Sequence, residues 1–386
     1  MTGGSGFLGG YVLAEAARRG HSCVALARSA EAAHTVVARG ATPLPGDLDD
    51  GAALAGIFAR AGCDALVNLA SLGFGHAPGV VRAAERSGLD RAVFISTTAV
   101  TTTLPARSKT VRLAAEDEIR TSDLSWTILR PTMIYGARGD RNLSRLLAVL
   151  ARLSLVPVPL MVPVPGGGRQ LQQPVHVADL ADAVLTAVER GAAARRRYDV
   201  AGPEPLTFAE LLRLSATAVG GRVHLVPVPL APVIALTRGY ERMSRRPRIR
   251  VEQWQRLTED KAFPIDAAAR DLDYAPRPFT EGIRAEAVAL GLARSFASSA
   301  PAPKFPPPAP PPPAPPPPAS PVPSARPPTL TTLIRRSHAQ HRQEPPGSRP
   351  RSARAAARPG PDAVQLLCPD ALPAPGLRHQ GDHHGR

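Results

Sequence analysis

The sequence contains few cysteines and few aromatic residues. Its 386 residues include three cysteines, Cys23, Cys63 and Cys368, which are odd in number and far apart. No Cys-x-x-Cys or Cys/His ligand spacing occurs, so we expect neither a disulfide framework nor a metal site. Aromatic residues make up 4% of the chain, which predicts a core of alanine, valine and leucine.

Long hydrophobic runs are also absent. The apolar segments 153–165 and 225–236 are interrupted by proline every few residues and are too short to span a bilayer. The N-terminus lacks the basic-then-apolar pattern of a signal peptide. These absences predict a cytoplasmic protein without an integral membrane segment.

Lysine is rare although the chain is basic. The net charge is +15 at pH 7, yet the only lysines are Lys109, Lys261 and Lys304. Nucleic-acid-binding domains usually carry a basic stripe interleaved with aromatic residues. No such stripe is visible, so we expect no nucleic-acid partner.

Proline is abundant and unevenly distributed. Of its 44 prolines, 17 lie between residues 301 and 328. A segment of this composition does not build a packed core. We therefore predict one folded unit over residues 1–294 and a disordered Pro/Arg-rich tail over residues 295–386.

Short aliphatic runs alternate with alanine-rich stretches in the first 130 residues. We predict buried strands at 21–27, 64–70, 91–96 and 125–130. We predict helices between them at 11–19, 50–61, 78–87 and 111–121. This alternation is typical of an α/β fold with a doubly wound parallel sheet.

The following residues are more mixed and predict a small C-terminal substrate lobe. It is drawn mainly from residues 137–260. Helices are expected at 142–151, Val177–Glu189 and 208–219, with a short strand at 197–200. The Val-Pro pairs at 156–159 and 226–229 predict extended edges or loops.

The chain opens with a glycine-rich stretch. Gly3, Gly6 and Gly9 form a Gly-x-x-Gly-x-x-Gly pattern directly before an alanine-rich segment. Glycines at these positions allow a sharp turn, a close approach of the backbone to a pyrophosphate, and tight packing of the following helix. The helix N-terminus then offers free N–H groups and a positive dipole to phosphate. The pattern predicts a nucleotide site.

Several further motifs follow the glycines in a fixed order. They are Gly-Asp-Leu at 46–48, Asn-Leu-Ala at 68–70, Ile-Ser-Thr at 95–97, Arg-Pro-Thr-Met-Ile-Tyr-Gly at 130–136, Val-His-Val-Ala-Asp-Leu at 175–180 and Asp-Leu-Asp-Tyr-Ala-Pro at 271–276. Together they resemble the extended or atypical short-chain dehydrogenase/reductase superfamily, over about residues 1–290. Within it, the segment 130–147 is similar to the branch that contains the nucleotide-binding accessory subunit of respiratory complex I.

This resemblance implies a Rossmann fold and an NAD(P)-binding oxidoreductase of the nucleotide-sugar epimerase/dehydratase type. Hydride would pass between the nicotinamide and a small substrate that the sequence does not identify. Related proteins often form homodimers, which the sequence leaves open. The cofactor-binding residues implied by the resemblance are Gly3, Gly6, Phe7, Leu8, Gly9, Arg28, Asp47, Leu48, Leu69, Ala70, Lys109 and Pro131.

The catalytic pair of the superfamily is incomplete here. Its general acid is the tyrosine of a Tyr-x-x-x-Lys motif; Lys109 aligns with the lysine, but position 105 is a proline. Proline has no proton to give. Lys109 remains the expected ribose ligand, and Ser96 or Thr97 the hydroxyl that polarises the substrate. The alternative is a non-catalytic NADP(H)-binding protein with a structural or redox-sensing role.

The residue after the second expected strand indicates which dinucleotide is bound. NAD sites carry an acid there and NADP sites an arginine. Arg28 follows that strand, and a guanidinium pairs well with a 2′-phosphate, so we favour NADP(H) over NAD(H). Asp47 either accepts from the adenine amino group or belongs to a helix N-cap within 47–50.

Members of the superfamily begin with a strand just before the first glycines. In this chain Met1 stands where that strand would end. The sequence therefore predicts a sheet whose first strand is missing, and we expect the true start to lie upstream.

Overall fold

The computed structural model describes residues 1–293, except 105, 138, 141, 155–159 and 245–258. The expected tail lies outside the described residues, and so does Pro105.

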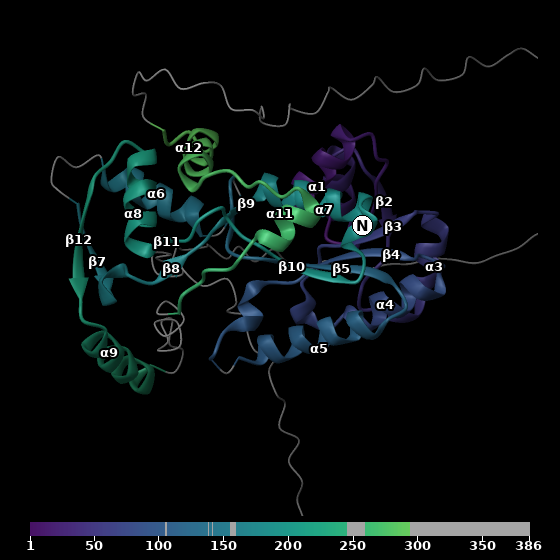
Figure 1. The fold of residues 1–386 in the computed structure, drawn as a ribbon, viewed down its shortest axis with the longest axis horizontal. Helices are drawn as coiled ribbons and strands as arrows, with labels where there is room; N and C mark the ends of the chain where they lie inside the picture. The colour runs from purple at the N-terminus through teal and green to yellow at the C-terminus, as the bar shows by residue number, and fades with distance from the viewer. Residues whose placement is uncertain (105, 138, 141, 155–159, 245–258, 294–386) are drawn as a thin grey trace, which may run out of the picture. The chain divides into compact units, whose positions relative to one another are not determined.

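The main sheet is parallel and contains the predicted strands, together with one strand, at residues 42–45, for which no range was predicted. Its strands are β1 (Val24–Ala27), β2 (Thr42–Pro45), β3 (Ala65–Asn68), β4 (Arg91–Ile95), β5 (Ser125–Pro131) and β10 (Arg196–Val200). One part has the order β10-β5-β4-β3 and the other pairs β1 with β2, all in parallel register. The doubly wound α/β fold is thereby confirmed (Figure 1).

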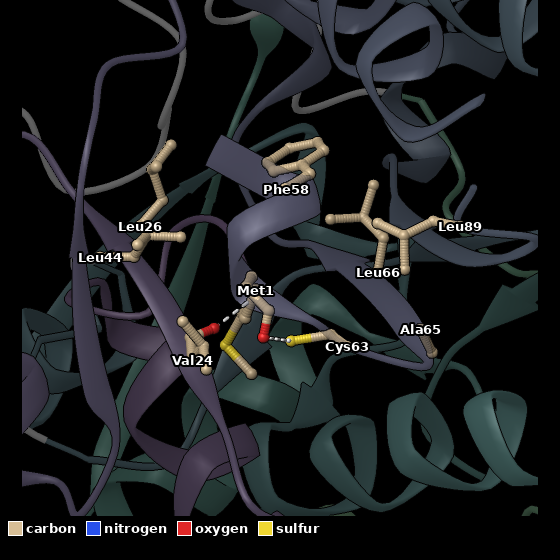
Figure 2. Close-up of a pocket in the computed structure, with 10 residues that line it drawn as sticks. Met1, Val24, Leu26, Leu44, Phe58, Cys63, Ala65, Leu66 and Leu89 are labelled. Atoms are coloured by element: carbon tan, nitrogen blue, oxygen red, sulfur yellow. Dashed lines mark hydrogen bonds between the residues drawn. The ribbon is translucent and has the colours of Figure 1, made fainter. Parts of the chain in front are cut away.

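Met1 and Thr2 join the two parts of the sheet. The Met1 amine donates to the Val24 carbonyl at 2.7 Å, and the Thr2 N–H donates to the Val67 carbonyl at 2.9 Å. Thr2 forms a parallel bridge with Asn68. Met1 and Thr2 thus lie between β1 and β3 at the centre of the sheet. Figure 2 shows an apolar cavity beside Met1, lined by residues that include Leu26, Leu44, Phe58 and Leu66.

Helices cover both faces of the sheet. The helices on one face are α1 (Phe7–Arg18), α2 (Ala30–Ala38), α7 (Val177–Glu189) and α11 (Asp266–Leu272). The helices on the other face are α3 (Gly51–Ala61), α4 (Ala77–Arg86) and α5 (Arg107–Thr121).

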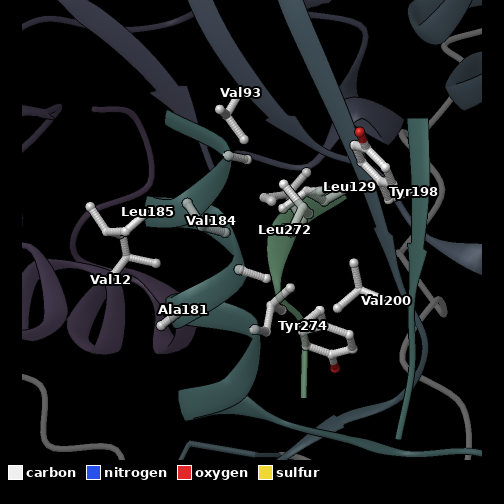
Figure 3. Close-up of a cluster of buried hydrophobic side chains, with 14 of the residues drawn as sticks. Val12, Val93, Leu129, Ala181, Val184, Leu185, Tyr198, Val200, Leu272 and Tyr274 are labelled. Carbon is white, nitrogen blue, oxygen red and sulfur yellow. The ribbon is translucent and has the colours of Figure 1, made fainter. Parts of the chain in front are cut away.

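The alternation of side chains along each strand explains this division. On β4, Val93 packs toward α1 and α7, whereas Phe94 packs toward α4 and α5. Figure 3 shows the first of these cores, in which Val12 of α1 lies beside Leu185 of α7 and which also includes Val93 and Val184. Both cores are aliphatic in the main, in agreement with the composition.

Helix α2 was missed by the sequence interpretation. The β-branched run Thr35-Val36-Val37 lowers helix propensity and obscured the pattern. The overlooked signal is Ser29, whose hydroxyl accepts from the Ala32 N–H at 3.2 Å and caps the helix. Helix α1 also begins at Phe7, earlier than the predicted residue 11.

The remaining elements form the smaller lobe and its connections. Its strands are β6 (Ile134–Tyr135), β7 (Leu160–Pro165), β8 (Leu171–Gln172), β9 (Val175–His176), β11 (Leu206–Thr207) and β12 (Val223–Val228). Its helices are α6 (Leu143–Leu153), α8 (Phe208–Ala218), α9 (Leu230–Met243) and α12 (Phe279–Ala289). Short 3-10 helices cover Leu72–Phe74, Thr98–Thr101, Gly166–Gly168 and Gly191–Ala193.

Three short strand pairs hold these elements together. Strands β7 and β12 are parallel, as are β6 and β9, whereas β8 and β11 are antiparallel. Residues 226–228 of the second Val-Pro segment lie in β12 and are extended and paired, whereas Pro229 is the N-cap of α9. The first segment, 156–159, lies outside the described residues. The lobe core includes Leu147, Leu211 and Ile283, so α12 contributes to it from beyond residue 260.

None of the helices in the described ranges is long and apolar enough to cross a membrane. Within the same ranges, no group of three or more His, Cys, Asp or Glu side chains is placed to hold a metal ion.

Candidate functional site: a glycine-rich turn at the carboxyl edge of the sheet

The glycine-rich turn is packed so closely that side chains are excluded from it. Gly3 has φ +72°, and a Cβ there would lie 3.0 Å from the Leu69 carbonyl carbon. A Cβ on Gly9 would lie 2.4 Å from the Gly3 carbonyl oxygen. The Gly6 N–H donates to that same oxygen at 3.0 Å. The glycines therefore bring the start of α1 directly onto the turn.

The N-terminus of α1 is open to an anion. Gly6 is the N-cap residue and supplies no side-chain hydrogen bond, and the first turn of α1 contains no acidic residue. The first N–H groups of a helix lack partners within the helix. The N–H groups of Phe7 and Leu8 are of this kind, and together with the dipole they suit a phosphate group. The residues present thus fit the pyrophosphate of a dinucleotide.

The ends of β3 and β5 lie at the same edge of the sheet as this turn, because parallel strands end together. Asn68 holds the backbone after β3: its amide donates to the Ala70 carbonyl at 3.1 Å and its oxygen accepts from the Thr2 hydroxyl at 2.6 Å. Leu69 and Ala70 are half-buried there. At the end of β5 the Pro131 carbonyl accepts from the Thr98 hydroxyl at 3.3 Å. Ligands of open parallel sheets bind at this edge.

Arg28 and Asp47 follow β1 and β2 and are both exposed. The Asp47 carboxylate accepts from the Asp49 N–H at 3.2 Å, within its own loop. The N-cap of α3 is Asp50, which accepts from the Ala53 N–H at 3.1 Å. The helix-cap alternative therefore applies to Asp50 and leaves Asp47 at the loop surface. Leu48, beside it, packs against the core under α3.

Lys109 lies in the first turn of α5 and is half-buried. Its ammonium donates to the Thr102 carbonyl. The same loop is held by Glu259, which accepts from the Thr102 hydroxyl at 2.6 Å and from the Thr103 N–H at 2.8 Å. The lysine is thus oriented from the loop that follows β4. Position 105, where the superfamily has tyrosine, is outside the described residues.

Ser96 and Thr97 have different surroundings. The Ser96 side chain is buried and its hydroxyl donates to Glu116 at 2.5 Å. Glu116 also accepts from the Arg130 Nε at 2.9 Å, and this buried pair joins α5 to β5. The hydroxyl of Ser96 therefore serves the network beneath the edge, so we do not assign it to a substrate. Thr97 is half-buried and accepts from the Ala99 N–H at 3.2 Å, which leaves its O–H free to donate.

The Tyr-Gly pair at the end of the 130–136 motif forms a structural joint. Tyr135 is 1% exposed and packs edge-to-face on His176, with ring centroids 5.3 Å apart. Gly136 has φ +137°, and a Cβ there would lie 2.6 Å from the His176 Nε2. Burial lowers the pKa of His176 to about 3, with Arg277 adding to the effect, so the imidazole is neutral at pH 7.

Arg39 is a residue at the turn that sequence reasoning missed. It follows α2, and its Nη1 donates to the carbonyl oxygens of Gly4 and Gly6. Arg39 is 35 residues from Gly4 in an arginine-rich chain, so no local sequence pattern indicated that it contacts the turn.

The comparisons with known proteins agree with this geometry. Residues 3–146 match a protein-family model described as NAD(P)H-binding. The chain is 29% identical over 316 residues to 4-hydroxy-2-methyl-3-oxo-4-farnesyl-3,4-dihydroquinoline-1-oxide ketoreductase of Stigmatella aurantiaca, which covers 72% of this chain and 91% of that protein. It is 27% identical over 161 residues to the mitochondrial NADH dehydrogenase (ubiquinone) 1 alpha subcomplex subunit 9 of Arabidopsis thaliana, covering 41% of this chain and 38% of that one.

Solved structures share the fold. The crystal structure of gox2253 has a TM-score of 0.62 at 21% identity and covers 75% of this chain and 96% of its own. UDP-glucose 4-epimerase of Thermus thermophilus, solved in complex with NAD, has a TM-score of 0.55 at 20% identity. The match covers 75% of this chain and 97% of the epimerase chain. The fold and the turn define an NAD(P)-binding Rossmann protein. The chain is thus similar to NAD(P)-binding proteins of the extended short-chain dehydrogenase/reductase superfamily.

Proposed function

We propose that the protein is an NADP(H)-dependent oxidoreductase that reduces a ketone on a small substrate. The observation that carries the proposal is the uncapped start of α1 behind the glycine-rich turn, at the sheet edge that also presents Thr97 and Lys109. A ketoreductase matched over 91% of its own length supports the reaction type.

The proposed reaction is balanced by one hydride and one proton. The reduced nicotinamide, when bound, supplies the hydride that forms the new C–H bond at the carbonyl carbon. The carbonyl oxygen takes a proton and becomes the alcohol. Thr97 donates its hydroxyl hydrogen to that oxygen and orients it. Lys109 holds the ribose of the dinucleotide. A tyrosine at 105 is absent, so we assign the proton to water passed through the Thr97 hydroxyl.

Arg28 supports the choice of NADP(H). It is exposed directly after β1, where the 2′-position of an adenine ribose lies in dinucleotide-binding folds. A guanidinium there binds a 2′-phosphate through two hydrogen bonds.

The second candidate function is non-catalytic binding of NADP(H). Pro105 in place of the tyrosine acid favours it. Both candidates predict tight dinucleotide binding, and they differ in turnover.

The first experiment measures the dissociation constants of NADPH and NADH by calorimetry on the full chain. We expect NADPH to bind more tightly, and Arg28→Gln to weaken NADPH about tenfold with little change for NADH, since one charge-assisted contact is lost. Arg60→Gln is the matched control, because Arg60 is exposed in the last turn of α3. Equal affinities in the wild type would remove the NADP(H) preference.

Turnover is then followed as NADPH oxidation with a panel of ketones, including prenylated quinolines. We expect Lys109→Ala and Thr97→Val to lower the rate constant. A chain that binds NADPH tightly and consumes none with any ketone would favour the non-catalytic candidate.

A further inference from the structure

Arg39 is a half-buried cation whose partners, within the part of the chain that the structure describes, are backbone carbonyl groups. Its Nη1 lies 2.6 Å from the Gly4 carbonyl oxygen and 2.7 Å from the Gly6 carbonyl oxygen. Among the described residues, no carboxylate comes within ion-pair distance of it, and burial lowers its pKa. Arg19 shows the contrast, because it contacts Glu15 and two further carboxylates.

The two carbonyl groups that Arg39 binds determine where the opposite sides of their peptides point. In a trans peptide the C=O and the following N–H point in opposite directions. Arg39 therefore turns the N–H groups of Ser5 and Phe7 away from itself. The Phe7 N–H is one of the open donors at the start of α1. A cation on the carbonyl side also polarises the peptide and strengthens its N–H as a donor.

The Arg39 guanidinium occupies space that is open because Gly10 has no side chain. A Cβ on Gly10 would be 3.0 Å from the Arg39 Cζ and 3.2 Å from its Nε. The guanidinium is thus packed against the first turns of α1, one helical turn below the open N–H groups. A side chain at position 10 would push it away from Gly4 and Gly6.

We propose that Arg39 is a positioning residue for the pyrophosphate of the dinucleotide. It holds the turn so that the N–H groups of Ser5 and Phe7 face the phosphates, and it provides a positive charge that no carboxylate of the described chain balances. The assignment rests on the proposed dinucleotide binding. It differs from the role of Arg28, because the pyrophosphate is common to NADH and NADPH whereas the 2′-phosphate is not.

The test measures the dissociation constants of NADPH and NADH for the full chain and for four variants. We expect Arg39→Gln to weaken both dinucleotides by a similar factor of about ten. Arg39→Lys keeps the charge and should recover part of the loss. Arg28→Gln, in the same assay, should affect NADPH alone.

Gly10→Ala keeps Arg39 and displaces its guanidinium. Alanine favours a helix over glycine, so the melting temperature without dinucleotide should not fall. We nevertheless expect weaker binding of both dinucleotides. The weakening in Arg39→Gln should come with a smaller dependence of affinity on salt concentration, which a purely structural role would leave unchanged.

Three results would overturn the assignment while the wild type still binds NADPH. They are unchanged affinities in Arg39→Gln, a loss confined to NADPH, and a loss fully explained by a lower melting temperature with no change in salt dependence. A wild type that binds neither dinucleotide would overturn the proposed function itself, and this assignment with it.

Discussion

At the scale of the residue, His176 shows how burial sets the chemistry of a side chain. Its Nδ1 accepts from the Ala178 N–H at 3.2 Å and caps α7, while its ring packs on Tyr135. Burial disfavours the charged imidazole and lowers the pKa to about 3. His176 therefore acts as a neutral helix cap in this fold.

The pH dependence of stability follows from that shift. A folded pKa below the unfolded value of about 6.5 contributes stability that is present above pH 6.5 and is lost as the pH falls toward 3. His176→Asn preserves a capping acceptor and removes the titration. We expect the free energy of unfolding, measured by urea denaturation from pH 7 to 4, to fall less steeply in the variant. Parallel pH profiles would contradict this account.

At the scale of the element, the docking of α1 on the glycine-rich turn decides whether the site forms. A Cβ on Gly9 would be 2.4 Å from the Gly3 carbonyl oxygen and 2.6 Å from that of Gly4. Both neighbours are backbone atoms, so neither can move without changing the turn. Arg39 then holds the same turn from the side of α2.

Gly9→Ala tests this close approach. We expect a loss of about 1–3 kcal/mol in the free energy of unfolding through overpacking, together with weaker NADPH binding. Gly239→Ala is the matched control: it also lies within a helix, α9, and a Cβ there meets nothing within 4 Å. Alanine at 239 should be neutral or stabilising. If the two variants had equal stability and affinity, the close approach would be irrelevant.

At the scale of the whole molecule, a buried pair of carboxyl groups links segments far apart in the sequence. The Asp140 carboxylate accepts from the Leu143 N–H at 3.2 Å and the Ser144 N–H at 3.3 Å at the start of α6, and Glu286 lies on α12 with 0% of its surface exposed. Burial, and next the nearby Asp140, raise the pKa of Glu286 to about 9. Glu286 is therefore protonated at pH 7.

This group makes the fold less stable as the pH rises. A folded pKa of about 9 against 4.5 unfolded gives stability that is complete below pH 4.5 and is lost progressively up to pH 9. Glu286→Gln removes the titration, so we expect a higher melting temperature at pH 8 and a flatter profile between pH 5 and 9. Glu281→Gln, at an exposed position of α12, is the control and should leave the profile unchanged. The same slope in Glu286→Gln and the wild type would refute the assignment.

The sequence by itself determined the features that depend on neighbouring residues. The spacing of Gly3, Gly6 and Gly9 predicts the turn, because Gly3 adopts a positive φ and a Cβ on Gly6 or Gly9 would meet the Gly3 carbonyl oxygen a few residues away. The alternation of aliphatic and alanine-rich stretches predicts the parallel sheet, since strands and helices follow local periodicity. Arg28 could be named from its place after one predicted strand.

Only the tertiary structure decided which distant groups meet. Arg39 reaches Gly4, Ser96 donates to Glu116, and Asp140 lies near Glu286, although the partners in each pair are far apart in the sequence. The spacing of residues along the sequence does not predict such contacts, because they form only when whole helices pack on the sheet. The same packing assigns the Ser96 hydroxyl to the interior and leaves Thr97 at the edge where a substrate is proposed to bind.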